Sequence, residues 1–179
     1  LNISGSGVSA LEPVRNLSKL ETLTATSSQV VSLQALQYSS SLLHLDIAST
    51  FVTDLGPVAN FIKLESLDVS GIQVDDISAV TALKNLRELR LNRSPVRSVD
   101  GLESLTNLEL LDLSGSVIAD LTPVGKLVGL HRLNINKTNI TDLGPLSALT
   151  ALEYIYLDNT PVSDLSPLKN LPELKAVYC

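Results

Sequence analysis

A repeat of 22 residues runs through the whole chain and constrains its fold more than any other feature of the sequence. At a step of 22, six positions carry an aliphatic side chain in nearly every copy. One such column reads Leu1, Leu23, Leu45, Leu67, Leu89, Leu111, Leu133, Ile155 and Val177. No insertion or deletion breaks the register. A fixed period of this length is the signature of a stacked architecture in which each copy contacts its neighbours.

The two halves of the repeat predict different local structures. The first half reads L-x-x-L-x-L, and its last two leucines alternate with polar residues, which predicts a short strand with one buried face. The second half typically reads V-x-D-L-x-P-L, and proline suits the first position of a helical turn. Serine or threonine before the proline, as at Thr122 and Ser166, is expected to cap that turn. Few residues remain before the next strand, so we expect a short 3₁₀ or α turn.

One copy cannot bury its own aliphatic side chains, whereas stacked copies bury them together. Each copy then adds one strand to a parallel sheet with a spacing of about 4.8 Å. The strand side and the helical side differ in width, so the stack should curve with the sheet on the inside. We therefore expect one α/β domain over residues 1–179, with seven full repeats in 17–170, partial repeats in 1–16 and 171–179, and no polar caps.

The repeat "LTNLELLDLSGSVIADLTPVGK" (105–126) resembles the leucine-rich repeat family, most closely the 22-residue repeats of internalins and of protein phosphatase-1 regulatory proteins. The resemblance implies a right-handed solenoid with a curved parallel sheet on the concave side and short 3₁₀ or α turns on the convex side. In this family an asparagine usually binds the backbone of the neighbouring turn. Here that column reads Ser6, Ser28, Thr50, Ile72, Ser94, Ser116, Thr138 and Thr160. A hydroxyl can also bond the turn backbone, whereas Ile72 cannot.

Residues that flank the buried strand leucine are expected to point onto the concave face. One such column is Thr22, His44, Ser66, Glu88, Leu110, Arg132, Tyr154 and Ala176, and the next runs from Asn2 through Asp46, Asp68, Arg90, Asp112 and Asn134 to Tyr156 and Tyr178. Three of the four tyrosines fall in these columns, all in the last two predicted strands. Exposed tyrosine and arginine are common anchors at protein interfaces.

These columns predict a binding patch composed of Leu110, Arg132, Tyr154, Tyr156 and Tyr178, which we call the tyrosine-end patch. The alternative is that tyrosine simply suits a half-exposed strand or covers the apolar end of the stack.

Four further candidates lie on the same predicted face: Glu88, Arg90, His44 and Asp46. Most such charges are ordinary solvated surface. His44, Asp46 and Ser66 on the next strand make a Ser-His-Asp arrangement geometrically conceivable. No strained elbow presents Ser66 and no oxyanion hole is evident, so the chain is not expected to be an enzyme.

Composition argues against several other classes of function. The net charge of −6, from 13 basic and 19 acidic residues, disfavours nucleic-acid phosphates. No apolar run approaches the roughly 20 residues that span a bilayer, and no signal peptide is visible. Cys179 is the single cysteine, so no internal disulfide forms and the compartment stays open. The aspartates at 54, 76, 120, 142 and 164 supply one carboxylate per turn, as caps do, so neither a metal nor another cofactor is expected.

Three aromatic residues outside the predicted face have separate expectations. Phe61 replaces the first leucine of its repeat and should be core, and Tyr38 should lie on the convex side. Phe51 is either exposed on one flank or folded over its neighbours, and we favour the second. The resulting hypothesis is a non-catalytic module that binds a protein partner on its concave face. The alternatives are a structural spacer or surface repeat of a larger protein, and recognition of a carbohydrate or small ligand by the same face. As an assembly, a monomer or an end-stacked oligomer is expected.

Overall fold

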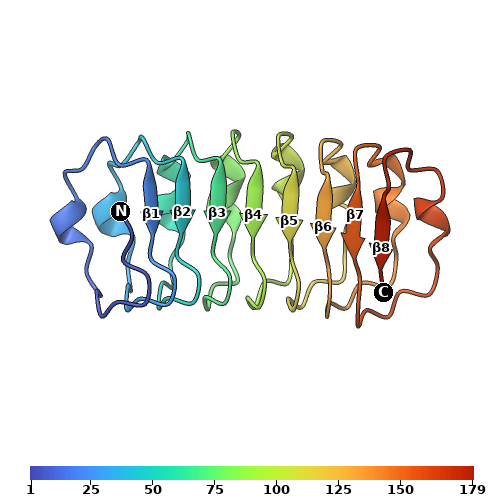
Figure 1. The fold of residues 1–179 in the computed structure, drawn as a ribbon, viewed down its shortest axis with the longest axis horizontal. Helices are drawn as coiled ribbons and strands as arrows, with labels where there is room; N and C mark the ends of the chain where they lie inside the picture. Colours follow the sequence, from blue (N-terminus) through green and yellow to red (C-terminus); the bar gives the residue numbers. More distant parts are fainter.

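A computed structural model describes residues 1–179 and arranges them as coils stacked along one axis, with a row of strands on one side (Figure 1). The strands are β1 (Thr22–Thr24), β2 (His44–Asp46), β3 (Ser66–Asp68), β4 (Glu88–Arg90), β5 (Leu110–Asp112), β6 (Arg132–Asn134), β7 (Tyr154–Tyr156) and β8 (Ala176–Tyr178). The 3₁₀ helices are η1 (Glu12–Val14), η2 (Gln34–Leu36), η3 (Gly56–Asn60), η4 (Ser78–Ala82), η5 (Leu102–Ser104), η6 (Val124–Lys126), η7 (Gly144–Ala148) and η8 (Ser166–Leu168).

All eight strands form one open parallel sheet in the order in which they occur in the chain. Because the 22-residue period is unbroken, each strand residue pairs with the residue 22 positions later, and Leu45, Leu67, Leu89 and Leu111 stand in one row. The register predicted from the aliphatic columns is therefore confirmed.

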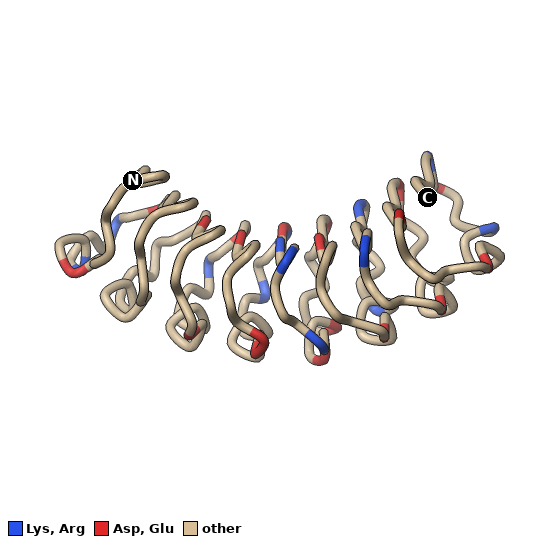
Figure 2. Tube along the Cα trace, turned by 90° about the horizontal axis from the view of Figure 1, so that it is seen from below, with Lys and Arg blue, Asp and Glu red and all other residues tan.

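The stack is an arc, with the strands on its concave side and the 3₁₀ helices on its convex side (Figure 2). Strands set the narrow spacing of neighbouring copies, whereas the helical turns need more room, so the sheet bends inward. The predicted architecture is confirmed, and the turns are 3₁₀ rather than α. None of these helices has the length and apolar character required to cross a bilayer.

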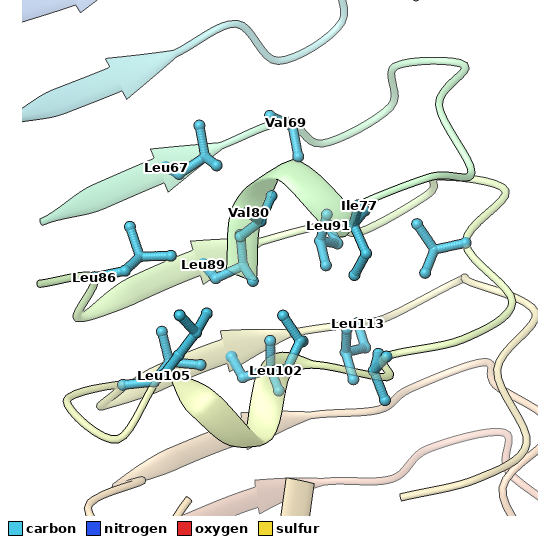
Figure 3. Close-up of a cluster of buried hydrophobic side chains, with 14 of the residues drawn as sticks. Leu67, Val69, Ile77, Val80, Leu86, Leu89, Leu91, Leu102, Leu105 and Leu113 are labelled. Atoms are coloured by element: carbon cyan, nitrogen blue, oxygen red, sulfur yellow. The ribbon is translucent and has the colours of Figure 1, made fainter. Parts of the chain in front are cut away.

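The core fills the space between the sheet and the 3₁₀ helices. The middle residue of each strand from β1 to β7 is buried, and side chains such as Val80 and Leu102 meet these residues from η4 and η5 (Figure 3). The cluster contains 48 buried hydrophobic residues and runs without interruption from Leu11 to Leu171. Each coil thus depends on its neighbours for burial, as the period predicts.

The serine and threonine column bonds within its own turn rather than to the next one. The Thr50 hydroxyl donates to the Ile47 carbonyl at 2.7 Å, and Thr138 donates to Ile135 at 2.7 Å in the same way. Ser28 is an exception, because its buried hydroxyl has no partner. A hydroxyl has one donor, and here that donor bonds the carbonyl three residues back. The amide of an asparagine would have a second donor and would extend further toward the next turn.

In η3, η4, η7 and η8 the first N–H is accepted by an aspartate two residues earlier, not by the residue before the proline, and Ser32 does the same at η2. The Asp54 carboxylate accepts the first N–H of η3, from Gly56, at 2.7 Å, and Asp164 accepts the first N–H of η8, from Ser166, at 2.8 Å. The Ser166 hydroxyl donates to Asp164 instead of accepting from the helix. These bonds, first the one from the backbone N–H of Ser166, lower the pKa of Asp164. The prediction for serine and threonine is therefore wrong, and that for the aspartates is confirmed.

The aromatic residues separate as predicted except at Phe51. Phe61 is fully buried, and Tyr38 is exposed just after η2, on the convex side. Phe51 is 59% exposed, so the prediction that it packs over its neighbours is wrong. Its column neighbours, Gln29 and Gln73, are also exposed, because this turn position points away from the core in those repeats too.

Ser39 is a polar residue in a core position that the sequence did not single out. It is buried with an unpaired hydroxyl, in a column that otherwise reads Leu17, Phe61, Leu83, Leu105, Leu127, Leu149 and Leu171. The one phenylalanine of this column is in the next coil. We interpret the two departures as one packing compensation, in which a large ring fills the volume that a small side chain leaves.

Candidate functional site on the concave face

The outer residues of each strand face the concave surface while the middle one is buried, as β7 illustrates. Tyr154 and Tyr156 are half-buried, and Ile155 between them is fully buried. The side-chain alternation of a strand thus places both rings on the concave face, and the placement predicted for these tyrosines is confirmed.

Tyr156 and Tyr178 form a stacked pair at one end of the sheet. They are register partners on β7 and β8, with ring centroids 4.6 Å apart and an angle of 5° between the ring planes. Tyr178 remains 44% exposed. The stacked rings each cover one face of the other and hold one another in place, which lowers the entropy that a ligand would have to remove.

Two cations lie near the ring of Tyr154. The guanidinium carbon of Arg132 is 5.3 Å from the ring centroid, and the Lys175 ammonium is 5.8 Å from it. Both distances fall within the range of cation–π attraction. Leu110 is the register partner of Arg132 and extends the surface toward β5. The five residues of the tyrosine-end patch are therefore contiguous, and Lys175 joins them as a residue that sequence reasoning missed.

The other four candidates of the concave face lie at two separate locations on the sheet. Glu88 and Arg90 form an ion pair at 2.8 Å, and Glu88 is the register partner of Leu110, so this pair borders the tyrosine-end patch. His44 and Asp46 lie far along the sheet on β2. Asp46 accepts from the Thr26 hydroxyl at 2.6 Å and from the Ala48 N–H at 3.0 Å.

His44 and Ser66 are register partners, but no hydrogen bond joins His44 to Ser66 or to Asp46. A Ser-His-Asp triad requires both of those bonds in sequence, so the three residues do not form one in this structure. The chain also contains no group of three or more His, Cys, Asp or Glu side chains arranged to hold a metal ion.

A row of alternating charges lies along the edge of the sheet where the strands begin. Its members from β3 to β8 are Glu65, Arg87, Glu109, His131, Glu153 and Lys175. Arg87 pairs with Glu109 at 2.8 Å, and Lys175 pairs with Glu153 at 2.8 Å. The alternation is visible in the sequence at a step of 22, but the ion pairs depend on side-chain conformation.

The Glu153–Lys175 pair predicts a pH dependence of stability. The hydrogen bond from Lys175, helped by the charges of Lys175, His131 and Arg132, lowers the pKa of Glu153 below its ordinary value of 4.5. The same hydrogen bond raises the pKa of Lys175 above 10.5. Glu153 therefore contributes its full share to the free energy of unfolding above the pKa that it has in the unfolded chain. This contribution is lost as the pH falls through the pKa of Glu153 in the folded protein. Lys175 contributes its full share below the pKa that it has in the unfolded chain, and this contribution is lost as the pH rises through its pKa in the folded protein.

Glu153→Gln should accordingly lower the melting temperature slightly between pH 6 and 9, and the difference from wild type should vanish in strong acid. Melting curves of both proteins across pH 2–11 measure this. Glu21→Gln, which removes an exposed carboxylate at the same repeat position as Glu153 but outside any ion pair, is the control. A deficit for Glu153→Gln that stays constant down to pH 2 would contradict the assignment.

Comparison with known proteins relates two stretches of the chain to a repeat family. A model of two copies of leucine-rich repeats matches residues 84–126 and again residues 128–170. Comparison of the sequence with curated proteins finds no significant match.

Solved structures match over almost the entire chain. Internalin F from Listeria monocytogenes superposes with a TM-score of 0.94 at 25% identity, covering 99% of this chain and 53% of that one. Internalin C2 from the same species gives 0.92 at 27% identity, covering 97% of this chain and 77% of that one. The ectodomain of the Arabidopsis thaliana receptor kinase GASSHO1/SCHENGEN3, solved in complex with CASPARIAN STRIP INTEGRITY FACTOR 2, gives 0.82 at 20% identity, covering 97% of this chain and 23% of that one.

This chain thus spans about half the length of the internalin F structure. At 20% identity the plant receptor shows the shared fold alone. The unbroken 22-residue period, the open parallel sheet with 3₁₀ turns and the two family matches agree with one another. The chain therefore has the leucine-rich-repeat fold, with two stretches that match the family model, and is similar in structure along its length to the internalins.

Proposed function

We propose that this chain is a non-catalytic module that binds a protein partner on its concave face, with the tyrosine-end patch as the main contact. Leucine-rich repeat domains are common protein-interaction modules. Function is not implied by a fold alone, so the argument depends on the side chains of the face itself.

The observation that carries the proposal is the clustering of preorganised anchors on β5 to β8. Two tyrosines stack at 4.6 Å, and a third has cations 5.3 and 5.8 Å from its ring centroid. Interface energy concentrates in a few tyrosine, tryptophan and arginine residues that are held in place and surrounded by weaker contacts. The Glu88–Arg90 pair beside Leu110 supplies such a polar rim.

Carbohydrate recognition is the second candidate, because the exposed Tyr178 offers a ligand both ring surface and a hydroxyl. The whole face is open, whereas a small-ligand site usually encloses most of its ligand. The geometry therefore favours a macromolecular protein partner, and a glycan array that shows specific binding in the absence of any protein partner would support the alternative.

Binding partners should lose affinity when the tyrosine-end patch is truncated. Proteins captured on the immobilised chain would be purified, and their dissociation constants measured against wild type and Tyr154→Ala/Tyr156→Ala. We expect a loss of about 2 kcal/mol or more, which corresponds to roughly 30-fold. Ile155 stays buried in both proteins, so circular dichroism should be unchanged.

Tyr38→Ala is the matched control, because Tyr38 is the chain's one tyrosine off the concave face and is 65% exposed. It should leave each dissociation constant unchanged. A partner that binds the double variant as tightly as wild type, or that depends on Tyr38 instead, would reject the proposed face.

A further inference from the structure

A polar groove lies at the edge of the sheet where β4, β5 and β6 end, and the proposed partner-binding function does not account for it. Its volume is about 410 Å³, and it is lined by Asn92, Arg93, Ser114, Gly115, Asn136 and Lys137. These are two adjacent positions of the repeat, taken from three consecutive coils. No hydrophobic side chain lines the groove, so any ligand it holds must be polar.

Hydrogen bonding within the chain leaves this groove rich in unused donors. The Asn136 side-chain oxygen accepts from the N–H of Asp158 at 2.7 Å, and its NH₂ group makes no bond within the chain. The Asn92 amide lies against the Ser70 hydroxyl, whose single proton goes to the Asp68 carboxylate, so Asn92 donates one N–H to Ser70 and its other N–H is unused. The Ser114 hydroxyl, the Arg93 guanidinium and the Lys137 ammonium are also without partners in the chain.

The backbone nitrogens of the groove are all used within the chain except that of Asn92, which makes no hydrogen bond. Those of Arg93, Gly115 and Lys137 donate to carbonyls of the next coil at 2.8 Å. The side chains thus present amide, hydroxyl and cationic donors. The two cations cannot accept a hydrogen bond, and the Ser114 hydroxyl can donate as well as accept, so the ligand that best matches the groove is an anionic acceptor.

The two cations occupy a backbone position that disfavours long side chains. Arg93 and Lys137 have φ of 57° and 56°, in the left-handed region, and Gly115 between them has φ of 70°. In other repeats this position holds Gly5, Ser27, Ser49, Gly71 and Asn159. Glycine and asparagine tolerate this conformation best, so arginine and lysine carry a conformational cost here. Side chains kept where the backbone disfavours them are a recognised pointer to function.

Gly115 keeps the space between the two cations open. A Cβ atom built on it would lie 3.6 Å from Cγ of Arg93, so the arginine stem runs alongside the glycine. A side chain at position 115 would enter the gap that separates Arg93 from Lys137. The groove is therefore shaped by one glycine with a cation on either side.

We propose that this groove binds an oxyanion of the carboxylate, sulfate or phosphate type between Arg93 and Lys137, with the Asn92, Ser114 and Asn136 donors completing its shell. Charge-assisted bonds to such groups are the strong ones among hydrogen bonds. Two acidic residues lie nearby. Asp112 is engaged by the Ser114 N–H at 2.9 Å and by the Asn134 amide at 3.3 Å, whereas the Asp158 carboxylate has no partner and weakens the local positive field.

Titration followed by NMR tests this with sodium sulfate, sodium phosphate and sodium glucuronate as probes, sodium chloride holding the ionic strength constant. The expected result is saturable shifts of the Gly115 amide and of the Asn92 and Asn136 side-chain NH₂ signals. Gly71, at the same repeat position outside the groove, should not respond. The tightest probe distinguishes a planar carboxylate from a tetrahedral anion.

Arg93→Ser/Lys137→Ser should raise the dissociation constant roughly tenfold or more. Serine occupies this position at Ser27 and Ser49, so the backbone accepts it. Gly115→Asn should block the groove, and Gly5→Asn, with nothing within 4 Å of its added Cβ, is its control. Lys63→Ser/Lys169→Ser removes the same charge from exposed sites elsewhere and should leave binding unchanged. Unsaturable shifts, equal shifts with chloride alone, or wild-type affinity in Arg93→Ser/Lys137→Ser would overturn the proposal.

Discussion

Leu111→Ala is expected to lower the free energy of unfolding by about 2–5 kcal/mol. Leu111 is fully buried in β5, between Leu89 and Leu133 in the row of strand leucines. The substitution removes three carbon atoms from a core that neighbouring coils share, and the fixed spacing of the strands prevents the coils from closing the cavity. Urea unfolding measures the effect, as a shift of the midpoint with an unchanged slope.

Leu110→Ala provides the matched control, since the same side chain is removed one residue earlier. Leu110 is half-buried on the concave face, and its loss should cost less than about 1 kcal/mol of stability. Equal destabilisation by the two variants would contradict the division of β5 into a core face and a concave face. Because Leu110 belongs to the tyrosine-end patch, this variant should affect binding more than stability.

Phe61→Ala is expected to cost about 3–5 kcal/mol, because its fully buried ring is one of the largest side chains of the core. The interpretation that Phe61 fills the volume left by Ser39 can be tested by changing the two residues singly and together. Ser39→Leu alone should overpack the column and destabilise by about 1–3 kcal/mol. Phe61→Leu alone should leave a void beside the small serine.

The variant with both Ser39→Leu and Phe61→Leu restores the leucines found in the other repeats. Its loss in free energy of unfolding should be smaller than the sum of the two single losses by about 0.5–3 kcal/mol, as expected for residues that share one volume. Urea unfolding of wild type, the two single variants and the double variant gives the four free energies that the comparison needs. A strictly additive result would show that the two residues do not compensate for one another.

Phe51→Ala is the control for the loss of a phenylalanine ring. The chain has two phenylalanines, and Phe51 is 59% exposed. Its removal should change the free energy of unfolding by about 0.5 kcal/mol or less, as for most surface substitutions. A large loss there would mean that Phe51 packs as the sequence suggested.

The candidate site was predictable in part, because strand alternation is a local property. The period placed Tyr156 beside Tyr178 and Arg132 beside Tyr154, and the register confirms both. That Lys175 approaches Tyr154 as a second cation while also pairing with Glu153 was not predictable. A long side chain can reach several partners, and only the neighbouring coils determine which it meets.

The donor-rich groove illustrates the same limit of sequence reasoning. Asn92 and Asn136 were visible in one column on either side of Ser114, but nothing in the sequence indicated that Ser70 and Asp158 would bond to their side-chain amides. A possible signal lay one position later, where arginine and lysine replace the small residues found in the other repeats. Its meaning depended on the left-handed backbone, which is a property of the folded turn.

By itself, the sequence determined the stacking, the strand register and the two faces of the sheet, because an unbroken period of aliphatic residues has one efficient way of burying itself. The tertiary structure alone decided that Phe51 is exposed, that Asp164 rather than the Ser166 hydroxyl accepts the first N–H of η8, and that Ser39 lies in the core next to the coil of Phe61. Those outcomes depend on which side chains from adjacent coils compete for the same space and the same hydrogen bonds. The sequence of a single repeat does not reveal this competition, because the competing side chains belong to different repeats.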